Sequence, residues 1–356
     1  MRTDPALRRF MELPRYLRTV ADGERLAETL TGVAGELGFD RLCVLSGPSA
    51  TAEIAGTLAG RLGPLVGSRL EIPDNSQASV DAAASSPALT AADAVVAVGG
   101  GKTIDVAKLA CEICDVAVIS VPTQLTADGI ASPVSVIRDA DGRTDSVRAR
   151  MPIAVLADLE VIERAPVASA RAGLGDLLAN PSAVHDWRLA AAAGREPVDD
   201  FAALLAQTAT DLVHASEVAP LGGGSPSREF LGRLLEGLVL SGLAMEIAGS
   251  SRPCSGSEHL FSHALDRLRP GTALHGEQVA LGSVLSAALQ GRDWRATRDL
   301  LIAAGMKDAA AGFHLSEDEL VATLELAPST RPQRYTVLDE VGEQERREAV
   351  VRALSG

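Results

Sequence analysis

Residues 93–108, Asp-Ala-Val-Val-Ala-Val-Gly-Gly-Gly-Lys-Thr-Ile-Asp-Val-Ala-Lys, join an apolar run to a segment of helical periodicity through three consecutive glycines. The apolar run predicts a buried strand, and Lys102 to Ile113 predicts a helix. Three glycines in a row cost conformational entropy unless something must approach the backbone closely, and the first turn of a helix offers unpaired N–H groups to an anion. We therefore predict a phosphate-binding turn that comprises Gly99, Gly100, Gly101, Lys102 and Thr103.

The turn matches neither of two common nucleotide-binding motifs. A Walker A loop needs a glycine five residues before Gly101, where Val96 stands. The dinucleotide pattern Gly-x-Gly-x-x-Gly needs a third glycine where Ile104 stands. The turn by itself therefore indicates a bound phosphate group without identifying the ligand.

On both sides of the turn, short apolar runs alternate with helical segments between residues 15 and 160. Further strand-like runs lie at 41–47, 116–123 and 152–159, and this alternation favours βαβ units in a parallel sheet. Asp141-Gly142, between two more such runs, predicts a β-hairpin. The first part of the chain therefore predicts an α/β, Rossmann-like fold.

The pattern changes at Glu160, after which Ala- and Leu-rich helical segments follow with almost no strand signal. Ser316 and Glu319, three residues apart before an apolar run, predict a capping box at the start of one helix. With 356 residues the chain is long enough for about two domains. We predict an α/β dinucleotide-binding domain over residues 1–160 and an all-α metal- and substrate-binding domain over 161–356.

Charge and cysteine content exclude several classes of partner and compartment. The chain has 33 basic and 47 acidic side chains, a formal net charge of −14, which disfavours nucleic acid and anionic lipid as partners. It has four cysteines and no uncharged apolar run of about 18 residues, so we expect neither a disulfide framework nor membrane insertion. These features favour a cytoplasmic protein with a small-molecule ligand.

Three of the six histidines fall within seventeen residues, at His259, His263 and His275. His259 and His263 are four residues apart on a predicted helix and share a face, and His275 opens the next helix. Imidazoles are common ligands of zinc, and a catalytic zinc site typically uses three protein ligands. The cluster predicts a metal site whose third ligand is a carboxylate. Spacing alone leaves four choices: Asp176, Glu258, Asp266 and Glu277.

Two further segments carry polar side chains that could contact a substrate or cofactor. Thr123, Thr126, Asp128 and Ser132 follow the strand at 116–123, where an α/β sheet presents its ligand-binding loops. Arg252 precedes His259 by seven residues. We expect this guanidinium to hold an anionic substrate group near the metal.

Together these motifs resemble those of sn-glycerol-1-phosphate dehydrogenases, which share a superfamily with iron-type alcohol dehydrogenases, glycerol dehydrogenases and 3-dehydroquinate synthases. The resemblance runs over nearly the whole chain. It rests on GGGKTIDVAK (99–108), SVPTQLTADGIASP (120–133), AGLGDLLAN (172–180), SGSEHLFSHALD (255–266), HGEQVALG (275–282) and RPQRYTVL (331–338). It implies a dehydroquinate synthase-like fold, a role in phospholipid metabolism and a homodimer or higher homo-oligomer.

The resemblance also implies a role for each matched residue. The metal ligands would be Asp176, His259 and His275. The glycine turn from Gly99 to Thr103, with Thr123, Thr126 and Ser132, would bind NAD or NADP, and Asp128, Asp176 and His263 would contact substrate. The metal would be Zn²⁺, with Ni²⁺ or Fe²⁺ as alternatives for two imidazoles and a carboxylate.

These roles lead to the expected reaction, a reversible hydride transfer between NAD(P)H and the phosphorylated ketone dihydroxyacetone phosphate. We expect His263 and Asp128 to act in catalysis. His263 would relay a proton to the substrate oxygen, because the pKa of an imidazole ordinarily lies near neutrality.

Three alternatives remain open from the sequence. The first is a cyclising lyase of the dehydroquinate synthase type, but its anion sites are usually rich in lysine and this chain has no lysine between Lys108 and Lys307. The second is a dehydrogenase for a related phosphorylated ketone or polyol. The third is a catalytically silent binding protein on the same fold, which the presence of all three metal-ligand residues disfavours.

Overall fold

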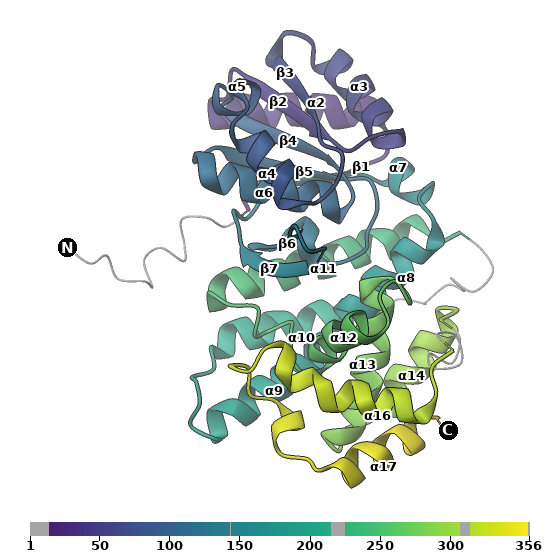
Figure 1. The fold of residues 1–356 in the computed structure, drawn as a ribbon. Coiled ribbons are helices and arrows are strands. Elements are labelled where there is room, and N and C mark those ends of the chain that lie inside the picture. Colours follow the sequence, from purple (N-terminus) through teal and green to yellow (C-terminus); the bar gives the residue numbers. More distant parts are fainter. Residues whose placement is uncertain (1–13, 143, 215–224, 307–313, 355–356) are drawn as a thin grey trace. The chain divides into compact units, whose positions relative to one another are not determined.

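The computed structural model describes residues 14–142, 144–214, 225–306 and 314–354. The chain forms two compact units, residues 1–166 and residues 167–356 (Figure 1). The sequence had suggested a boundary at residue 160.

The first unit is built on a six-stranded parallel sheet with the strand order β1-β8-β5-β4-β2-β3. The strands are β1 (Tyr16–Val20), β2 (Leu42–Ser46), β3 (Val66–Glu71), β4 (Ala94–Gly99), β5 (Ala117–Pro122) and β8 (Ala154–Asp158). The helices are α2 (Gly23–Leu37), α3 (Ala50–Leu62), α4 (Gln77–Ala84), α5 (Pro87–Thr90), α6 (Gly101–Cys114) and α7 (Leu159–Glu163), with 3₁₀ turns η1 (Gly63–Leu65) and η2 (Asp128–Ile130). The predicted α/β fold is confirmed.

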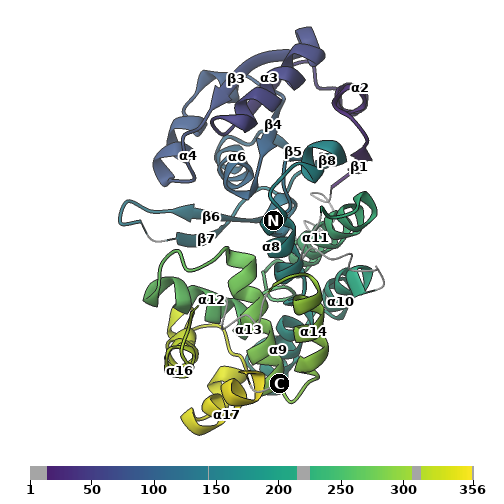
Figure 2. The ribbon, with the colours of Figure 1, turned by 90° about the vertical axis from the view of Figure 1, so that its right-hand side faces the viewer.

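The core of this unit explains why its central strands read as continuous apolar runs. Every residue of β2, β4 and β8 is buried, as expected for parallel strands covered on both faces by helices (Figure 2). Leu26, Leu30 and Val33 line the buried face of α2 against this sheet. The edge strand β1 is only partly buried and was not recognised in the sequence.

The order of the sheet changes direction between β2 and β4. From β2 the chain continues outward to β3, whereas from β4 it continues to β5 on the other side. Ligands in open α/β sheets bind at the carboxyl ends of the strands at such a switch point. The glycine turn follows β4 at this place in the sheet.

The predicted hairpin is also present. Strands β6 (Val134–Arg138) and β7 (Thr144–Arg148) pair antiparallel in a small sheet of their own. Gly142 lies in the connection with a φ of +82°, a left-handed conformation that glycine adopts without strain.

The second unit is helical throughout its described residues. Its α-helices are α8 (Val167–Leu177), α9 (Asn180–Ala192), α10 (Asp200–His214), α11 (Arg228–Ala248), α12 (Ser257–Leu268), α13 (His275–Leu289), α14 (Trp294–Ala303), α16 (Glu317–Leu326) and α17 (Glu343–Leu354), with 3₁₀ turns η3 (Ala327–Thr330) and η4 (Val337–Asp339). The capping box predicted at Ser316 and Glu319 begins α16.

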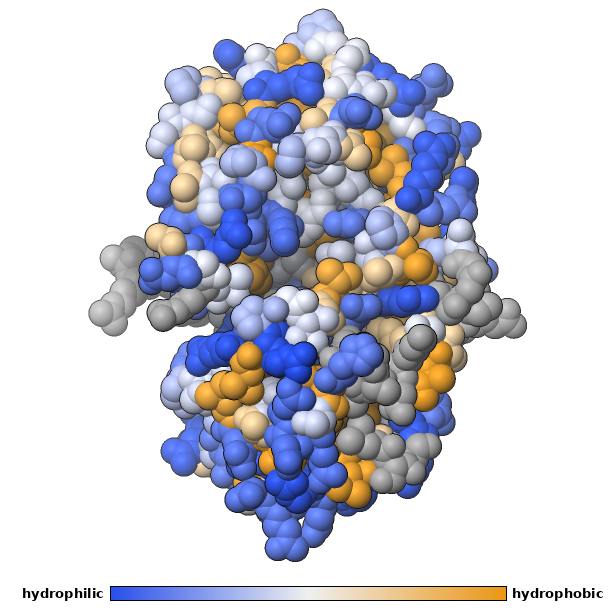
Figure 3. All heavy atoms as spheres, turned by 45° about the vertical axis from the view of Figure 1, so that its right-hand side comes forward, coloured by the Kyte–Doolittle hydropathy of each residue, from blue (hydrophilic) through white to orange (hydrophobic). Residues whose placement is uncertain are grey.

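Hydrophilic side chains cover most of the face drawn in Figure 3, and apolar side chains lie between them in small groups. Within the described parts of the chain, no helix combines the length and the apolar character needed to span a bilayer.

Candidate active site

The glycine turn in the first unit is crowded by the side chains around it. A Cβ atom on Gly100 would lie 2.3 Å from Nε2 of Gln124, and one on Gly99 would lie 2.7 Å from Cβ of Thr103. Thr123 donates its backbone N–H to the carbonyl of Gly99 at 3.0 Å, which ties the loop after β5 to the turn. Any larger residue at these glycines would displace that loop or the first turn of α6.

The same loop is also held by a buried lysine. Lys108 is fully buried, and its Nζ donates to the carbonyl oxygens of Gly129, Ser132 and Val134 at 2.6, 3.1 and 2.5 Å. Asp105, one turn earlier on α6, compensates the charge of Lys108 through an ion pair in which its Oδ1 lies 3.0 Å from Nζ. This pair was not predicted from the sequence, although an acid and a lysine three residues apart in the otherwise apolar stretch 104–111 were a usable signal.

The remaining residues expected in the cofactor site lie around this loop. The hydroxyl of Thr126 would lie 3.5 Å from a Cβ on Gly101, so it sits beside the turn. Lys102 is exposed on the first turn of α6, and Asp128 is half-buried at the start of η2. Ser132 is 1% exposed, and its hydroxyl bonds to the backbone two residues further on.

In the second unit, three helices bring together a carboxylate and two imidazoles. Asp176 comes from the end of α8, His259 from the first turn of α12 and His275 from the start of α13. One ligand atom from each lies within 4.8 Å of the other two. Nε2 of His259 is 3.4 Å and Nε2 of His275 is 3.9 Å from the same oxygen of Asp176.

These separations fit a shared metal ion better than direct hydrogen bonds. Atoms bound about 2.1 Å from a tetrahedral ion lie about 3.4 Å from one another. Of the four acids that the sequence left open, Asp176 is the one that shares a site with both imidazoles.

Two glycines let α8 and α13 approach closely enough for this geometry. A Cβ on Gly276 would lie 1.9 Å from the carbonyl oxygen of Ala172, and one on Gly175 would lie 2.2 Å from the carbonyl oxygen of Gly276. Gly175 directly precedes Asp176, and Gly276 directly follows His275. The backbone contact therefore lies immediately beside two of the three candidate ligands.

The two imidazoles have very different pKa values because their surroundings differ. Burial alone would lower the pKa of His259, but its contacts with the carboxylates of Asp176 and Glu258 raise it to about 9. Burial, together with the neighbouring charge of His259, lowers the pKa of His275 to about 4. Without an ion, His259 therefore carries a positive charge between two carboxylates at neutral pH.

His263 lies one turn beyond His259 on α12, with its ring centroid 6.1 Å from that of His275. The sequence had led us to expect a pKa near neutrality. Burial instead lowers the pKa of His263 well below 6.5, and the charges of Arg331, the other two imidazoles and Arg334 lower it further. The imidazole of His263 is therefore neutral at pH 7.

Several arginines lie on this side of the helical unit. Arg252 is 3% exposed and forms an ion pair with Glu196, while its Nη1 has no hydrogen-bond partner among the described residues. Arg334 donates to the carbonyl of Ser255 and, at 2.9 Å, to the hydroxyl of Ser251. Burial and the charges of neighbouring arginines lower the pKa of Arg334 to about 9. The sequence predicted a role in anion binding for Arg252. It predicted none for Arg334, which lies in the segment 331–338 that carries part of the family resemblance.

Comparison with known proteins places these features in a family. A family model for iron-containing alcohol dehydrogenases matches residues 23–166. The chain is 38% identical over 335 residues to the glycerol-1-phosphate dehydrogenase, NAD(P)+, of Methanothrix thermoacetophila, which covers 92% of each protein. The enzyme of the same name from Thermococcus sibiricus is also 38% identical, over 94% of this chain and 95% of the relative. The chain belongs to the glycerol-1-phosphate dehydrogenase family.

Solved structures support the fold of this family member. A probable glycerol dehydrogenase from Sinorhizobium meliloti superposes with a TM-score of 0.75 at 20% identity, over 96% of this chain and 97% of the other. A sulfoacetaldehyde reductase from Bifidobacterium kashiwanohense, solved with NAD+, gives a TM-score of 0.72 at 20% identity, over 96% and 98%. At these identities the likeness concerns the fold alone.

Proposed function

We propose that this chain is an NAD(P)-dependent, metal-dependent oxidoreductase that interconverts dihydroxyacetone phosphate and sn-glycerol 1-phosphate. The observation that carries the proposal is the convergence of Asp176, His259 and His275 within 4.8 Å. Relatives that match over more than nine-tenths of their length and bear the name glycerol-1-phosphate dehydrogenase support the choice of substrate.

The donor set fits a divalent cation, and we propose Zn²⁺, with Ni²⁺ or Fe²⁺ as alternatives. Asp176 is 4% exposed, and both imidazoles turn their Nε2 atoms toward it. Held there, the ion would act as a Lewis acid that polarises the C2 carbonyl of the substrate.

We propose that the first unit binds the cofactor, which would supply or accept the hydride. The backbone N–H groups of Gly99 to Thr103 would hold the pyrophosphate at the start of α6, a helix of 14 residues. Thr123, Thr126 and Ser132 would complete the site. Because a Cβ on Gly99 or Gly100 would collide with neighbouring side chains, only glycine at these positions leaves room around the backbone N–H groups.

His263 and Asp128 are the proposed catalytic side chains. Because the surroundings keep His263 neutral, its imidazole can accept the proton of the C2 hydroxyl when the alcohol is oxidised and release it to solvent. When the ketone is reduced, His263 would relay to that oxygen a proton that it first takes up from solvent. Asp128, Asp176 and His263 would contact the substrate, as the family resemblance implies.

Arginines beside the histidines would hold the phosphate group of the substrate. Arg252 remains our proposal for one of them, since its buried Nη1 has no partner among the described residues. The charges of Arg331 and Arg334 act on His263, and they add positive potential beside this group. A dianionic phosphate is the substrate group that such surroundings favour.

A single assay tests the reaction. The purified chain is mixed with reduced cofactor and dihydroxyacetone phosphate, and the absorbance of the reduced nicotinamide is followed. We expect net oxidation of the cofactor, loss of the rate after chelation, and recovery with one of the proposed metals. A lyase that returns its cofactor unchanged, or a silent binding protein, would show no net oxidation. Full activity without metal would reject the metal mechanism.

Assembly is a separate prediction. We expect a homodimer or a higher homo-oligomer, which light scattering of the purified chain would measure directly.

A further inference from the structure

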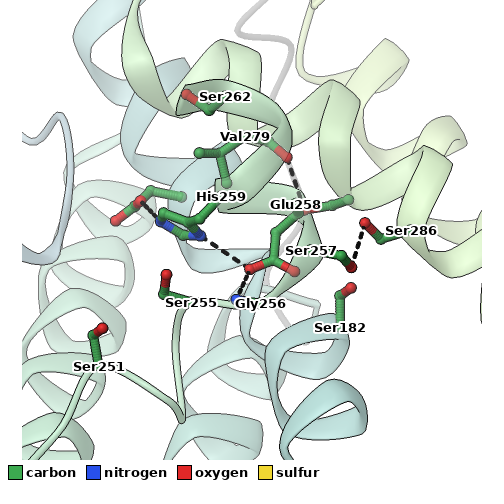
Figure 4. A network of polar contacts seen from close by, with 12 residues as sticks. Ser182, Ser251, Ser255, Gly256, Ser257, Glu258, His259, Ser262, Val279 and Ser286 are labelled. Atoms are coloured by element: carbon green, nitrogen blue, oxygen red, sulfur yellow. Dashed lines mark hydrogen bonds and ion pairs between the residues drawn. The ribbon is translucent and has the colours of Figure 1, made fainter. Parts of the chain in front are cut away.

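One buried acid beside the proposed metal ligands has no role in the reaction described above. Glu258 is fully buried at the start of α12. One of its oxygens accepts a hydrogen bond from the backbone N–H of Gly256 at 2.5 Å and contacts Nδ1 of His259 at 3.0 Å (Figure 4). Its other oxygen has no hydrogen-bond partner among the described residues. A buried carboxylate with an unsatisfied oxygen is costly and calls for a specific reason.

The contact fixes the chemical form of His259. An ionised carboxylate can only accept hydrogen bonds, so Nδ1 of His259 carries the hydrogen that points to Glu258. The ring is thereby oriented with Nε2 toward Asp176, 3.4 Å away. A histidine that binds a metal through one nitrogen typically donates from the other to such a partner.

The second imidazole is oriented by a different, uncharged partner. The hydroxyl of Ser262 lies 3.0 Å from Nδ1 of His275, and it donates its own hydrogen to Oε1 of Gln278 at 2.8 Å. Nε2 of Gln278 in turn donates to Asp266 at 2.8 Å, which fixes the direction of the amide. Since the serine hydrogen is already used, its oxygen accepts from Nδ1 of His275, and Nε2 of this ring is also left to face Asp176.

We propose that Glu258 is a positioning residue that sets the metal affinity of the site through His259, and that it acts more strongly than the neutral Ser262 acts through His275. The inference rests on the metal centre of the proposed function. A charge-assisted hydrogen bond to a ring nitrogen is about twice as strong as a neutral one, and it makes the opposite nitrogen a better donor to the ion.

Three variants test this assignment. Glu258→Gln keeps the size of the side chain and an acceptor oxygen but removes the charge, and Ser262→Ala removes the neutral partner of His275. Ser286→Ala is the matched control, because its hydroxyl bonds to Ser257 at 2.8 Å in the same buried region without touching either imidazole. Zinc affinity is measured by competition with a chromophoric chelator, and the visible absorption of the Co²⁺-loaded chain reports ligand geometry.

Outer partners of metal-bound histidines typically change metal affinity by about 10- to 100-fold. We expect a loss in this range for Glu258→Gln together with an altered Co²⁺ spectrum, a smaller loss for Ser262→Ala, and wild-type values for Ser286→Ala. Wild-type affinity in Glu258→Gln, or an equal or larger loss in Ser262→Ala, would overturn the assignment.

A second variant covers the case in which Glu258→Gln does not fold. Glu258→Asp keeps the charge but withdraws the carboxylate from His259 by one methylene, and we expect the same direction of change; unchanged affinity in this variant would equally overturn the assignment. A wild-type chain that binds no divalent metal would overturn the proposed metal centre itself, which separates that failure from the failure of the role of Glu258.

Discussion

The close approach of α8 and α13 can be tested by substituting alanine for Gly276. A Cβ at this position would lie 1.9 Å from the carbonyl oxygen of Ala172, about 1.5 Å short of the 3.4 Å at which ordinary contact begins. The atom that it meets belongs to the backbone of a helix and cannot rotate away. The two helices would therefore have to separate by more than 1 Å.

This displacement affects both stability and metal binding. Overpacking of a core typically costs about 1–3 kcal/mol, while alanine in place of glycine within a helix returns up to about 1 kcal/mol, so we expect a net loss of about 1–2 kcal/mol. Metal–ligand distances tolerate deviations of only about 0.2 Å, and Asp176 and His275 lie directly beside the contact. We expect the zinc affinity to fall by at least about tenfold.

The measurements are urea unfolding of the metal-free chain and zinc competition with a chelator. Gly232→Ala is the matched control, because Gly232 lies inside α11 with nothing within 4 Å of the position that a Cβ would occupy. It should gain about 0.5–1 kcal/mol and keep its zinc affinity. If Gly276→Ala behaves like Gly232→Ala in both assays, the tight contact is not what aligns the ligands.

Three further substitutions give independent predictions. Lys108→Met removes the charge that compensates buried Asp105, and should lower the unfolding free energy by about 3–5 kcal/mol in a urea titration; a double variant with Asp105→Asn should recover part of this loss, and a loss that simply adds would contradict the pairing. Asp186 is buried in α9, and burial together with the charge of Glu258 raises its pKa to about 6. Because the folded chain holds this proton more tightly than the unfolded chain, protonated Asp186 stabilises the fold below about pH 4, and this stabilisation is lost as the pH rises through 6. Relative to Asp186→Asn, the wild type should lose roughly 3 kcal/mol across that range, and a gap in unfolding free energy that does not change with pH would reject the shift. Arg252→Ala should raise the KM for dihydroxyacetone phosphate far more than for dihydroxyacetone, and equal effects on both would remove Arg252 from the phosphate site.

Patterns confined to short segments predicted much of the fold correctly. Strand β4, the glycine turn and α6 form one continuous stretch, and their apolar run, glycines and helical period all lie between residues 94 and 114. The hairpin followed from Asp141-Gly142 for the same reason. Strand β1 was missed because Arg18 and Thr19 are exposed on an edge strand, so no apolar run marks it.

The candidate site was predictable in part, because its members come from distant segments. The spacing of His259 and His275 indicated a metal site but left four acids open, and Asp176 followed only from the family resemblance. Spacing could not select it because the site depends on the packing of α8 against α13, through backbone atoms that no spacing pattern records. Glu258 was noticed only as an alternative ligand. Glu258 contacts Nδ1 of His259, whereas Asp176 faces Nε2 on the opposite edge of the ring. This arrangement depends on the backbone path at the start of α12, which the spacing of residues does not record.

Both parts of the proposed site use glycine to bring backbone atoms close to something else, but with different physical consequences. At Gly100 the space that a Cβ would need is taken by the flexible end of Gln124, so a larger residue there displaces a side chain of the cofactor loop. At Gly276 the space is taken by the backbone of α8, so a larger residue moves a whole helix and the carboxylate on it. The first arrangement sets the shape of the proposed cofactor loop, whereas the second sets the distance between the proposed metal ligands. Because side chains yield more easily than helices, the proposed metal site depends more strictly on its packing than the glycine turn does.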